Sequence, residues 1–141
     1  MTHQDPLAAY ARFYETLTPQ TVSAVREHVA DGIRFRDPFN DTTGVAAYER
    51  ILSKIFEDMA APRFETLHML GDGAVGYLKW RVRFRARNGA ERAVVGVSEL
   101  RFDAARRITE HLDYWDPASQ LYEAVPVLGF VLRKIRERMA A

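Results

Sequence analysis

Two ionisable residues near the C-terminal end of the sequence have the types and spacing needed for acid–base chemistry. His111 and Asp113 lie two positions apart in the segment 108–116, which we read as a strand. Successive side chains of a strand point to opposite faces, so this pair shares a face with Thr109 and Trp115. A carboxylate beside an imidazole can hold one tautomer of the ring and raise its basicity. The pattern therefore predicts a proton-transfer site beside a large apolar wall.

The opposite face of the same strand is expected to be a packing surface. It carries Ile108, Glu110, Leu112 and Tyr114. An alternative for the first face stays open, because His111 and Asp113 could instead pair with arginines of neighbouring strands or with a second subunit.

A third ionisable residue, Asp37, follows an earlier strand. Residues 33–36 alternate apolar and basic side chains, and the sequence Asp37-Pro38-Phe39 then enters a loop that we expect to continue to Thr43. Asp37 therefore lies at a strand end.

Helical spacing of apolar residues dominates the first half of the chain. Asp5-Pro6 is typical of a helix start, with the aspartate as N-cap and the proline in the first turn. A second helix is expected from Thr21 to the break at Asp31-Gly32. A third is expected to be capped by Thr43 and to end before Pro62.

The second half changes to the alternating pattern of strands. Strands are predicted over residues 63–69, 75–85, 91–102 and 108–116, with a hairpin turn at Asn88-Gly89. Helices followed by antiparallel strands indicate an α+β fold, in which the helices lie on one side of a curved, mostly antiparallel sheet.

Composition limits the classes of function. The chain has 141 residues, which fits one domain, and its 20 basic and 19 acidic residues give no general attraction to nucleic acid. Cysteine is absent and no histidine pair has the spacing of a zinc signature, so we expect no metal site and no cofactor. With no signal-like start, we expect a cytoplasmic protein.

Residues 117–141 are predicted to form a helical extension of the single domain 1–141. Asp116-Pro117 repeats the cap-and-proline start, and a break is expected at Val125-Pro126. Beyond the break, an apolar stripe and a basic stripe share one helix. Such a helix suits a lid, a dimer arm or contact with a membrane surface, of which the first two are the commoner uses.

Several local sequences, in this order, resemble the nuclear transport factor 2-like superfamily, in particular its SnoaL-like and ketosteroid isomerase-like members. They are Tyr10-Ala11-Arg12-Phe13-Tyr14, Phe35-Arg36-Asp37-Pro38-Phe39, Ser98-Glu99-Leu100-Arg101-Phe102 and the last strand with Trp115. The resemblance implies a cone-shaped, cystatin-like α+β fold whose strongly curved sheet and helices enclose an apolar pocket. It also implies a homodimer formed through the open face of the sheet.

The resemblance also implies roles for particular residues. Asp37 matches the general base of ketosteroid isomerases, and Trp115 matches an aromatic wall of the pocket. The two oxyanion donors of that enzyme correspond to Phe13 and Ser98, and losing one such donor typically costs about a hundredfold or more in rate. We therefore do not expect steroid isomerisation by that mechanism.

The predicted site has an acid–base set and a pocket lining. The acid–base set is Asp37, His111 and Asp113, and the lining is Tyr10, Phe13, Tyr14, Tyr48, Trp80, Phe84, Ser98 and Trp115. The hypothesis is a cofactor-free isomerase, cyclase, dehydratase or epoxide hydrolase acting on an apolar metabolite that the sequence does not name. The alternative is a ligand-binding or dimeric interaction module without catalysis.

Overall fold

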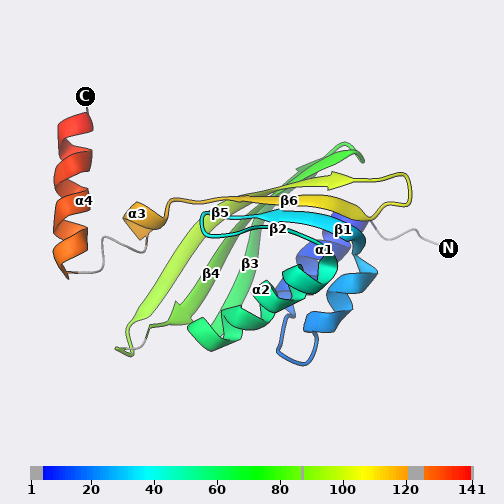
Figure 1. Cartoon of the computed structure of the whole chain (residues 1–141), viewed down its shortest axis with the longest axis horizontal. Helices are drawn as coiled ribbons and strands as arrows, with labels where there is room; N and C mark the ends of the chain where they lie inside the picture. Colours follow the sequence, from blue (N-terminus) through cyan, green and yellow to red (C-terminus); the bar gives the residue numbers. More distant parts are fainter. Residues whose placement is uncertain (1–4, 87, 121–125, 141) are drawn as a thin grey trace.

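The protein is described by a computed structural model of residues 5–86, 88–120 and 126–140, with the side chains of residues 126–128 outside the description. Figure 1 shows a curved sheet with helices against one of its faces and a separate helix at the C-terminal end. This arrangement confirms the predicted α+β class.

The helices of the first half begin and end close to the predicted positions. Helix α1 spans Pro6–Glu15, and the side chain of Asp5 caps it by accepting a hydrogen bond from the backbone N–H of Leu7. A 3₁₀ helix, η1, spans Val22–Glu27, and helix α2 spans Val45–Asp58. The expected second helix is thus only a short 3₁₀ helix, because the chain is already extended from Val29 onward.

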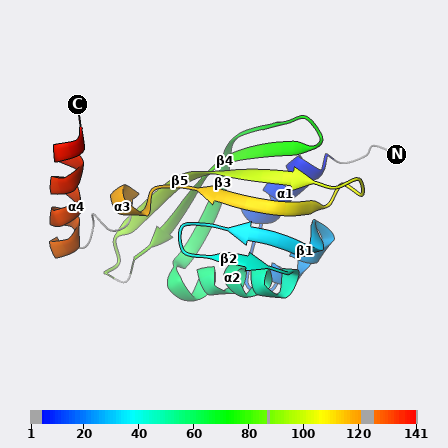
Figure 2. The same cartoon turned by 45° about the horizontal axis from the view of Figure 1, so that its top comes forward.

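Six strands form one mixed sheet. They are β1 (Val29–Arg36), β2 (Asp41–Thr43), β3 (Ala60–Gly71), β4 (Val75–Arg85), β5 (Glu91–Phe102) and β6 (Ile108–Tyr114). Their order is β2-β1-β6-β5-β4-β3, and all neighbours are antiparallel except the parallel pair β1 and β6. The first and last strands of the chain therefore lie side by side in the middle of the sheet (Figure 2).

The core lies between the helices and the inner face of the sheet. Helix α1 contributes Tyr10 and Phe13, and α2 contributes Tyr48 and Leu52. The alternating side chains of β4 include Leu78 and others that point inward, as the sequence pattern predicts. Apolar residues at helical spacing on one element and at alternate positions on the next thus meet across one interior.

The segment between β1 and α2 differs from the expectation. Residues 41–43 form β2 and pair with β1, so the predicted loop and the predicted cap at Thr43 are both wrong. Gly44 takes the N-cap position with φ of 102° and no side-chain cap. A positive φ of this size favours glycine, and Thr43 cannot cap the helix while it lies in a strand.

A bulge in β6 changes which side chains face the interior. Arg101 pairs with Glu110 whereas Phe102 pairs with Ile108, so Thr109 is an extra residue in β6. Ile108 and His111 are both buried, with 1% and 2% of their surface exposed. The expectation that they lie on opposite faces is wrong, because one inserted residue reverses the alternation.

The C-terminal part contains helices α3 (Pro117–Gln120) and α4 (Pro126–Met139), and the predicted break at Val125 falls outside the described residues. Helix α4 stands apart from the sheet in both Figures 1 and 2. It exposes apolar side chains, including Phe130, Val131 and Ile135. No helix within the described ranges has both the length and the apolar character needed to cross a bilayer.

Candidate functional site

A cavity of about 140 Å³ opens between α2 and the inner face of the sheet. Its walls are mainly apolar, with Leu52, Ile55, Phe35, Phe64 and Val82 among the lining residues. The polar residues that line it are Tyr14, Asp37, Glu65, Thr66, Ser98, His111 and Asp113. The cavity thus combines an apolar interior with a small set of groups able to donate or accept protons.

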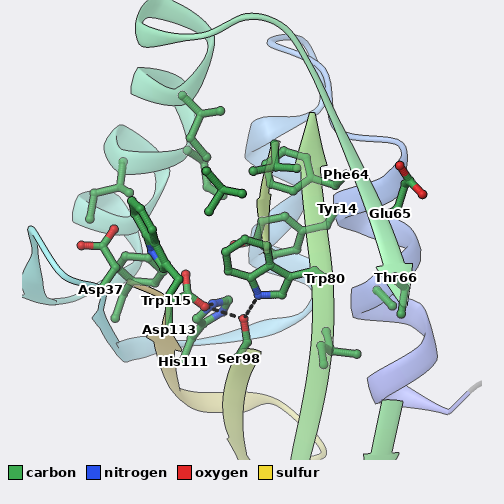
Figure 3. A pocket seen from close by; sticks show the side chains of 18 of the residues that line it. Tyr14, Asp37, Phe64, Glu65, Thr66, Trp80, Ser98, His111, Asp113 and Trp115 are labelled. Atoms are coloured by element: carbon green, nitrogen blue, oxygen red, sulfur yellow. Dashed lines mark hydrogen bonds and ion pairs between the residues drawn. The ribbon is translucent and has the colours of Figure 1, made fainter. Parts of the chain in front are cut away.

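His111 and Asp113 form the centre of the polar wall (Figure 3). The Nε2 atom of His111 lies 2.7 Å from Oδ1 of Asp113. The hydroxyl of Ser98, on the neighbouring strand β5, donates to the same oxygen and accepts from the indole N–H of Trp80 at 2.9 Å. Asp113 is thereby held by two donors while its side chain stays 15% exposed.

Three tyrosines continue the hydrogen-bonded chain on the other side of the imidazole. Nδ1 of His111 lies 2.7 Å from the hydroxyl of Tyr10. That hydroxyl contacts the hydroxyl of Tyr48, which in turn contacts that of Tyr14. Because Tyr14 and Asp113 both line the cavity, this series of hydrogen bonds begins and ends at the cavity.

The direction of these hydrogen bonds follows from the ionised form of Asp113. A carboxylate only accepts, so Nε2 of His111 carries a proton; with the imidazole neutral, Nδ1 then accepts from Tyr10. Tyr10 then accepts from Tyr48, and Tyr48 accepts from Tyr14. Burial raises the pKa of Tyr10, Tyr48 and Tyr14 above the usual tyrosine value, so all three hydroxyls are neutral near pH 7.

Asp37 also lines the cavity, but one of its oxygens is committed to the loop. Oδ1 accepts from the backbone N–H of Phe39 at 2.8 Å and from that of Asn40 at 2.6 Å. The side-chain amide of Asn40 donates to Oδ1 at 3.0 Å and to Oδ2 at 3.2 Å. Asp37 therefore shapes the turn after β1 in addition to facing the cavity.

The predicted acid–base residues Asp37, His111 and Asp113 all line this one cavity. Of the predicted pocket residues, Tyr14, Trp80, Ser98 and Trp115 also line it. Tyr10, Phe13, Tyr48 and Phe84 do not, and the expectation for these four is corrected. Tyr10, Phe13 and Tyr48 point into the core between α1, α2 and the sheet, and Phe84 packs in a second cluster with Val82 and Val94.

Sequence reasoning missed part of the wall and the contact between the tyrosines and His111. Phe64 of β3 and Phe35 of β1 line the cavity, and Phe35 lies 4.9 Å from the ring of His111. Their positions in alternating strands were a usable signal. No local sequence pattern indicates the contact between Tyr10 and His111, because 101 positions separate the two residues.

The described residues bring together no group of three or more histidine, aspartate and glutamate side chains suited to a metal ion. The chemistry that this geometry supports is proton transfer by side chains. Asp113 and Tyr14 are the groups at the two ends of the hydrogen-bonded series, and the buried His111 joins them through Tyr10 and Tyr48.

A family model described as the SnoaL-like domain matches residues 10–111. The chain belongs to this SnoaL-like family. The match begins at Tyr10 and ends at His111, the two residues whose side chains meet at 2.7 Å. No curated protein sequence matches this SnoaL-like chain.

Solved structures similar to this SnoaL-like chain have the nuclear transport factor 2-like fold. A protein of unknown function from Burkholderia pseudomallei aligns with a TM-score of 0.72 and 17% identity, over 83% of this chain and 95% of its own. A protein with a ketosteroid isomerase-like fold from Catenulispora acidiphila, in complex with trimethylamine, aligns with a TM-score of 0.70 and 15% identity. The alignment covers 85% of this chain and 92% of that protein. An epoxide hydrolase from M. tuberculosis aligns with a TM-score of 0.68 and 14% identity, over 97% of this chain and 95% of its own.

Proposed function

We propose that this SnoaL-like protein is an enzyme that moves a proton on a compact, mainly apolar small molecule held in the cavity. The observation that carries the proposal is a carboxylate, Asp113, oriented by a buried imidazole at the wall of an apolar cavity. Ionisable groups in such a setting belong to functional sites more often than to structural networks. Isomerisation, cyclisation, dehydration and epoxide opening are the reaction classes that fit.

Asp113 is the group proposed to exchange the proton with the ligand. His111 and Ser98 both donate to Oδ1, which fixes the carboxylate and leaves Oδ2 for a ligand. Both nitrogens of His111 already have partners, so His111 acts as a positioning residue. Side chains alone can supply the acid and the base, and the proposed reaction needs no bound cofactor.

The experiment measures exchange of carbon-bound protons with solvent. The protein is incubated in D₂O with a panel of small cyclic ketones and lactones, and loss of the α-proton signal is followed by NMR. Asp113 would take the proton from carbon and return a deuteron. We expect Asp113→Asn to slow this exchange about a hundredfold or more, since a positioned general base typically contributes that much.

A matched control is Asp41→Asn, because Asp41 is an exposed carboxylate that pairs with Arg34 outside the cavity. It should leave the exchange rate unchanged. If no compound exchanges above the protein-free rate, or if Asp113→Asn is as fast as the parent, the enzymatic proposal is wrong and a non-catalytic binding function takes its place.

The outer face of the sheet favours a second, compatible role as a dimer. Leu70, Tyr77 and Tyr114 are 63%, 45% and 48% exposed there. The hydroxyls of both tyrosines donate to Glu99, which leaves their rings as apolar surface. We propose that a second copy of the chain covers this face. Sedimentation velocity should show a dimer that Tyr77→Glu dissociates, and a monomeric parent chain would contradict it.

Helix α4 supports a further proposal, contact with a membrane surface. Its exposed side chains include apolar Val131 and Ile135 and basic Lys134, an arrangement typical of interfacial helices. Liposomes with anionic lipid should pellet the parent chain and not the double variant Val131→Glu/Ile135→Glu. Equal sedimentation of the two chains would leave lid or dimer packing as the role of α4.

A further inference from the structure

The carboxylates that face the cavity have no lysine or arginine beside them in its wall. Asp37 and Asp113 both line it, and no lysine or arginine of the described chain does. Glu65 is also at the wall, but its carboxylate points away from the cavity in Figure 3 and pairs with Arg83 at 2.8 Å and Arg81 at 3.6 Å. With the imidazole of His111 neutral, the charge that a ligand meets inside is negative.

Both carboxylates act on the same part of the cavity. The pKa of Tyr14 is raised first by burial, then by the charge of Asp113 and, more weakly, by that of Asp37. The hydroxyl of Tyr14 therefore lies within the electric field of both carboxylates. A ligand group placed near Tyr14 would be in that field as well.

The hydrogen-bond donors of the wall are already in use. Ser98 and His111 donate to Asp113, and Trp80 donates to Ser98. The hydroxyl of Tyr14 donates to Tyr48 in the direction derived above, and Thr66 donates to Glu15. Apart from the indole of Trp115, every side-chain donor that lines the cavity has a partner, so the wall offers mainly acceptors to a ligand.

Aromatic rings form part of the wall around these acceptors. Trp80, Trp115, Tyr14, Phe35 and Phe64 all line the cavity, and the rings of Tyr14 and Phe64 meet edge to face at 5.3 Å. The face of an aromatic ring attracts a cation, most strongly when both are away from water. Negative charge, unused acceptors and aromatic faces all favour the same kind of ligand.

The size of the cavity limits that ligand to about one ring. Its volume of about 140 Å³ is close to that of the engineered apolar cavity of roughly 150 Å³ that binds benzene. A steroid nucleus is far larger. A ligand with a six-membered ring and one polar group would fill the enclosed part.

We infer that the cavity selects a compact organic amine in its protonated form, whose ammonium group lies between Asp113, Asp37 and the oxygen of Tyr14. This inference rests on the proposed function, because it names the substrate class for the same site. The apolar part of the amine would lie against Trp80, Phe64 and the aliphatic residues of α2.

The test compares three ligands of similar size and different charge: cyclohexylamine, cyclohexanol and cyclohexanecarboxylate. Both tryptophans of the chain line the cavity, so tryptophan fluorescence reports binding directly. At pH 7 we expect the protonated amine to bind at least about tenfold more tightly than the alcohol, and the carboxylate to bind more weakly than either.

Variants test whether the charge of the site, rather than its shape, sets the preference for the amine. Asp113→Asn should reduce the preference for amine over alcohol to less than about threefold, while the control Asp41→Asn should keep it. If Asp113→Asn does not fold, Asp37→Asn tests the second carboxylate of the site, since its amide oxygen can still accept the loop hydrogen bonds at Oδ1.

Equal binding of amine and alcohol, tighter binding of the carboxylate, or no binding of any of the three would overturn the inference. These outcomes are independent of the proton-exchange experiment, which uses neutral ketones and lactones. The amine preference can therefore fail while exchange is observed, and exchange can fail while the preference is observed.

Discussion

The imidazole of His111 joins a carboxylate at the cavity wall to a core tyrosine from the other end of the chain. Its Nε2 bonds to Asp113 on its own strand, and its Nδ1 bonds to Tyr10 on the first helix. His111 is only 2% exposed, so its two nitrogens depend on these protein partners for their hydrogen bonds. The contribution of this residue to stability and its role in positioning Asp113 are therefore linked.

Replacing His111 should destabilise the fold. In His111→Phe the ring still fills the space, but the hydroxyl of Tyr10 loses its acceptor. Asp113 keeps only Ser98 as a hydrogen-bond donor. A buried polar group left without a partner costs roughly 1–3 kcal/mol. We expect the free energy of unfolding in urea to fall by about this amount. His68→Phe on exposed β3 is the control and should change it by less than about 0.5 kcal/mol.

Stability should fall at high pH because of the buried tyrosines. Burial raises the pKa of Tyr10, Tyr14 and Tyr48 in the folded chain, whereas an unfolded tyrosine ionises near about pH 10. Above that pH the unfolded state releases protons that the folded state keeps, so the free energy of unfolding decreases as pH rises. Urea unfolding between about pH 8 and pH 12 measures the decrease.

Tyr14→Phe removes one of these groups and should make the alkaline decrease less steep. Tyr77→Phe changes an exposed tyrosine on the outer face and should leave the slope unchanged. An unchanged slope in Tyr14→Phe would contradict the assignment of the decrease to this cluster.

Stability should also fall on the acid side through His28. Burial lowers the pKa of His28, the nearby Glu27 raises it, and Arg107 lowers it further, so the folded pKa lies below the unfolded one. As pH drops below about 6.5 the unfolded state takes up the proton first, and stability is lost. His28→Phe keeps the packing against Phe13 at 5.3 Å and should flatten the profile below about pH 6.5.

Gly96 is predicted to be the glycine of β5 that cannot carry a side chain. A Cβ there would lie 2.5 Å from the ring of Trp80 and 3.0 Å from the Cβ of Trp115. We expect Gly96→Ala to displace Trp80, change tryptophan fluorescence and cost roughly 1–3 kcal/mol. Gly32→Ala is the matched control, since a Cβ at Gly32 meets nothing within 4 Å and its backbone is not left-handed. Normal fluorescence and stability in Gly96→Ala would contradict the described packing.

Much of the fold could be predicted because most of its signals are local. The bounds of β4 and β5 follow from alternation and from the turn at Asn88-Gly89, where Gly89 has φ of 81°. The cap at Asp5 depends on a contact two residues away. The polar partners of the site are not local: Tyr10 and Tyr48 look like ordinary core residues until His111 is placed beside them.

The wrong predictions at Ile108 and Thr43 come from features that leave no pattern in the sequence. Thr109 is one additional residue in a strand, and nothing in its type distinguishes it from a paired residue, so counting by two puts Ile108 on the wrong face. Gly44 replaces Thr43 as the cap because β2 forms, and a three-residue strand is too short to give an alternating pattern.

The parallel pairing of β1 with β6 affects when the protein can fold during synthesis. Val29 pairs with Ile108 and Phe35 with His111, so the first strand has its main neighbour only after some four-fifths of the chain has been made. Until then a nascent chain leaving the ribosome exposes one edge of β1. We expect chaperone dependence to fall once residue 114 has emerged.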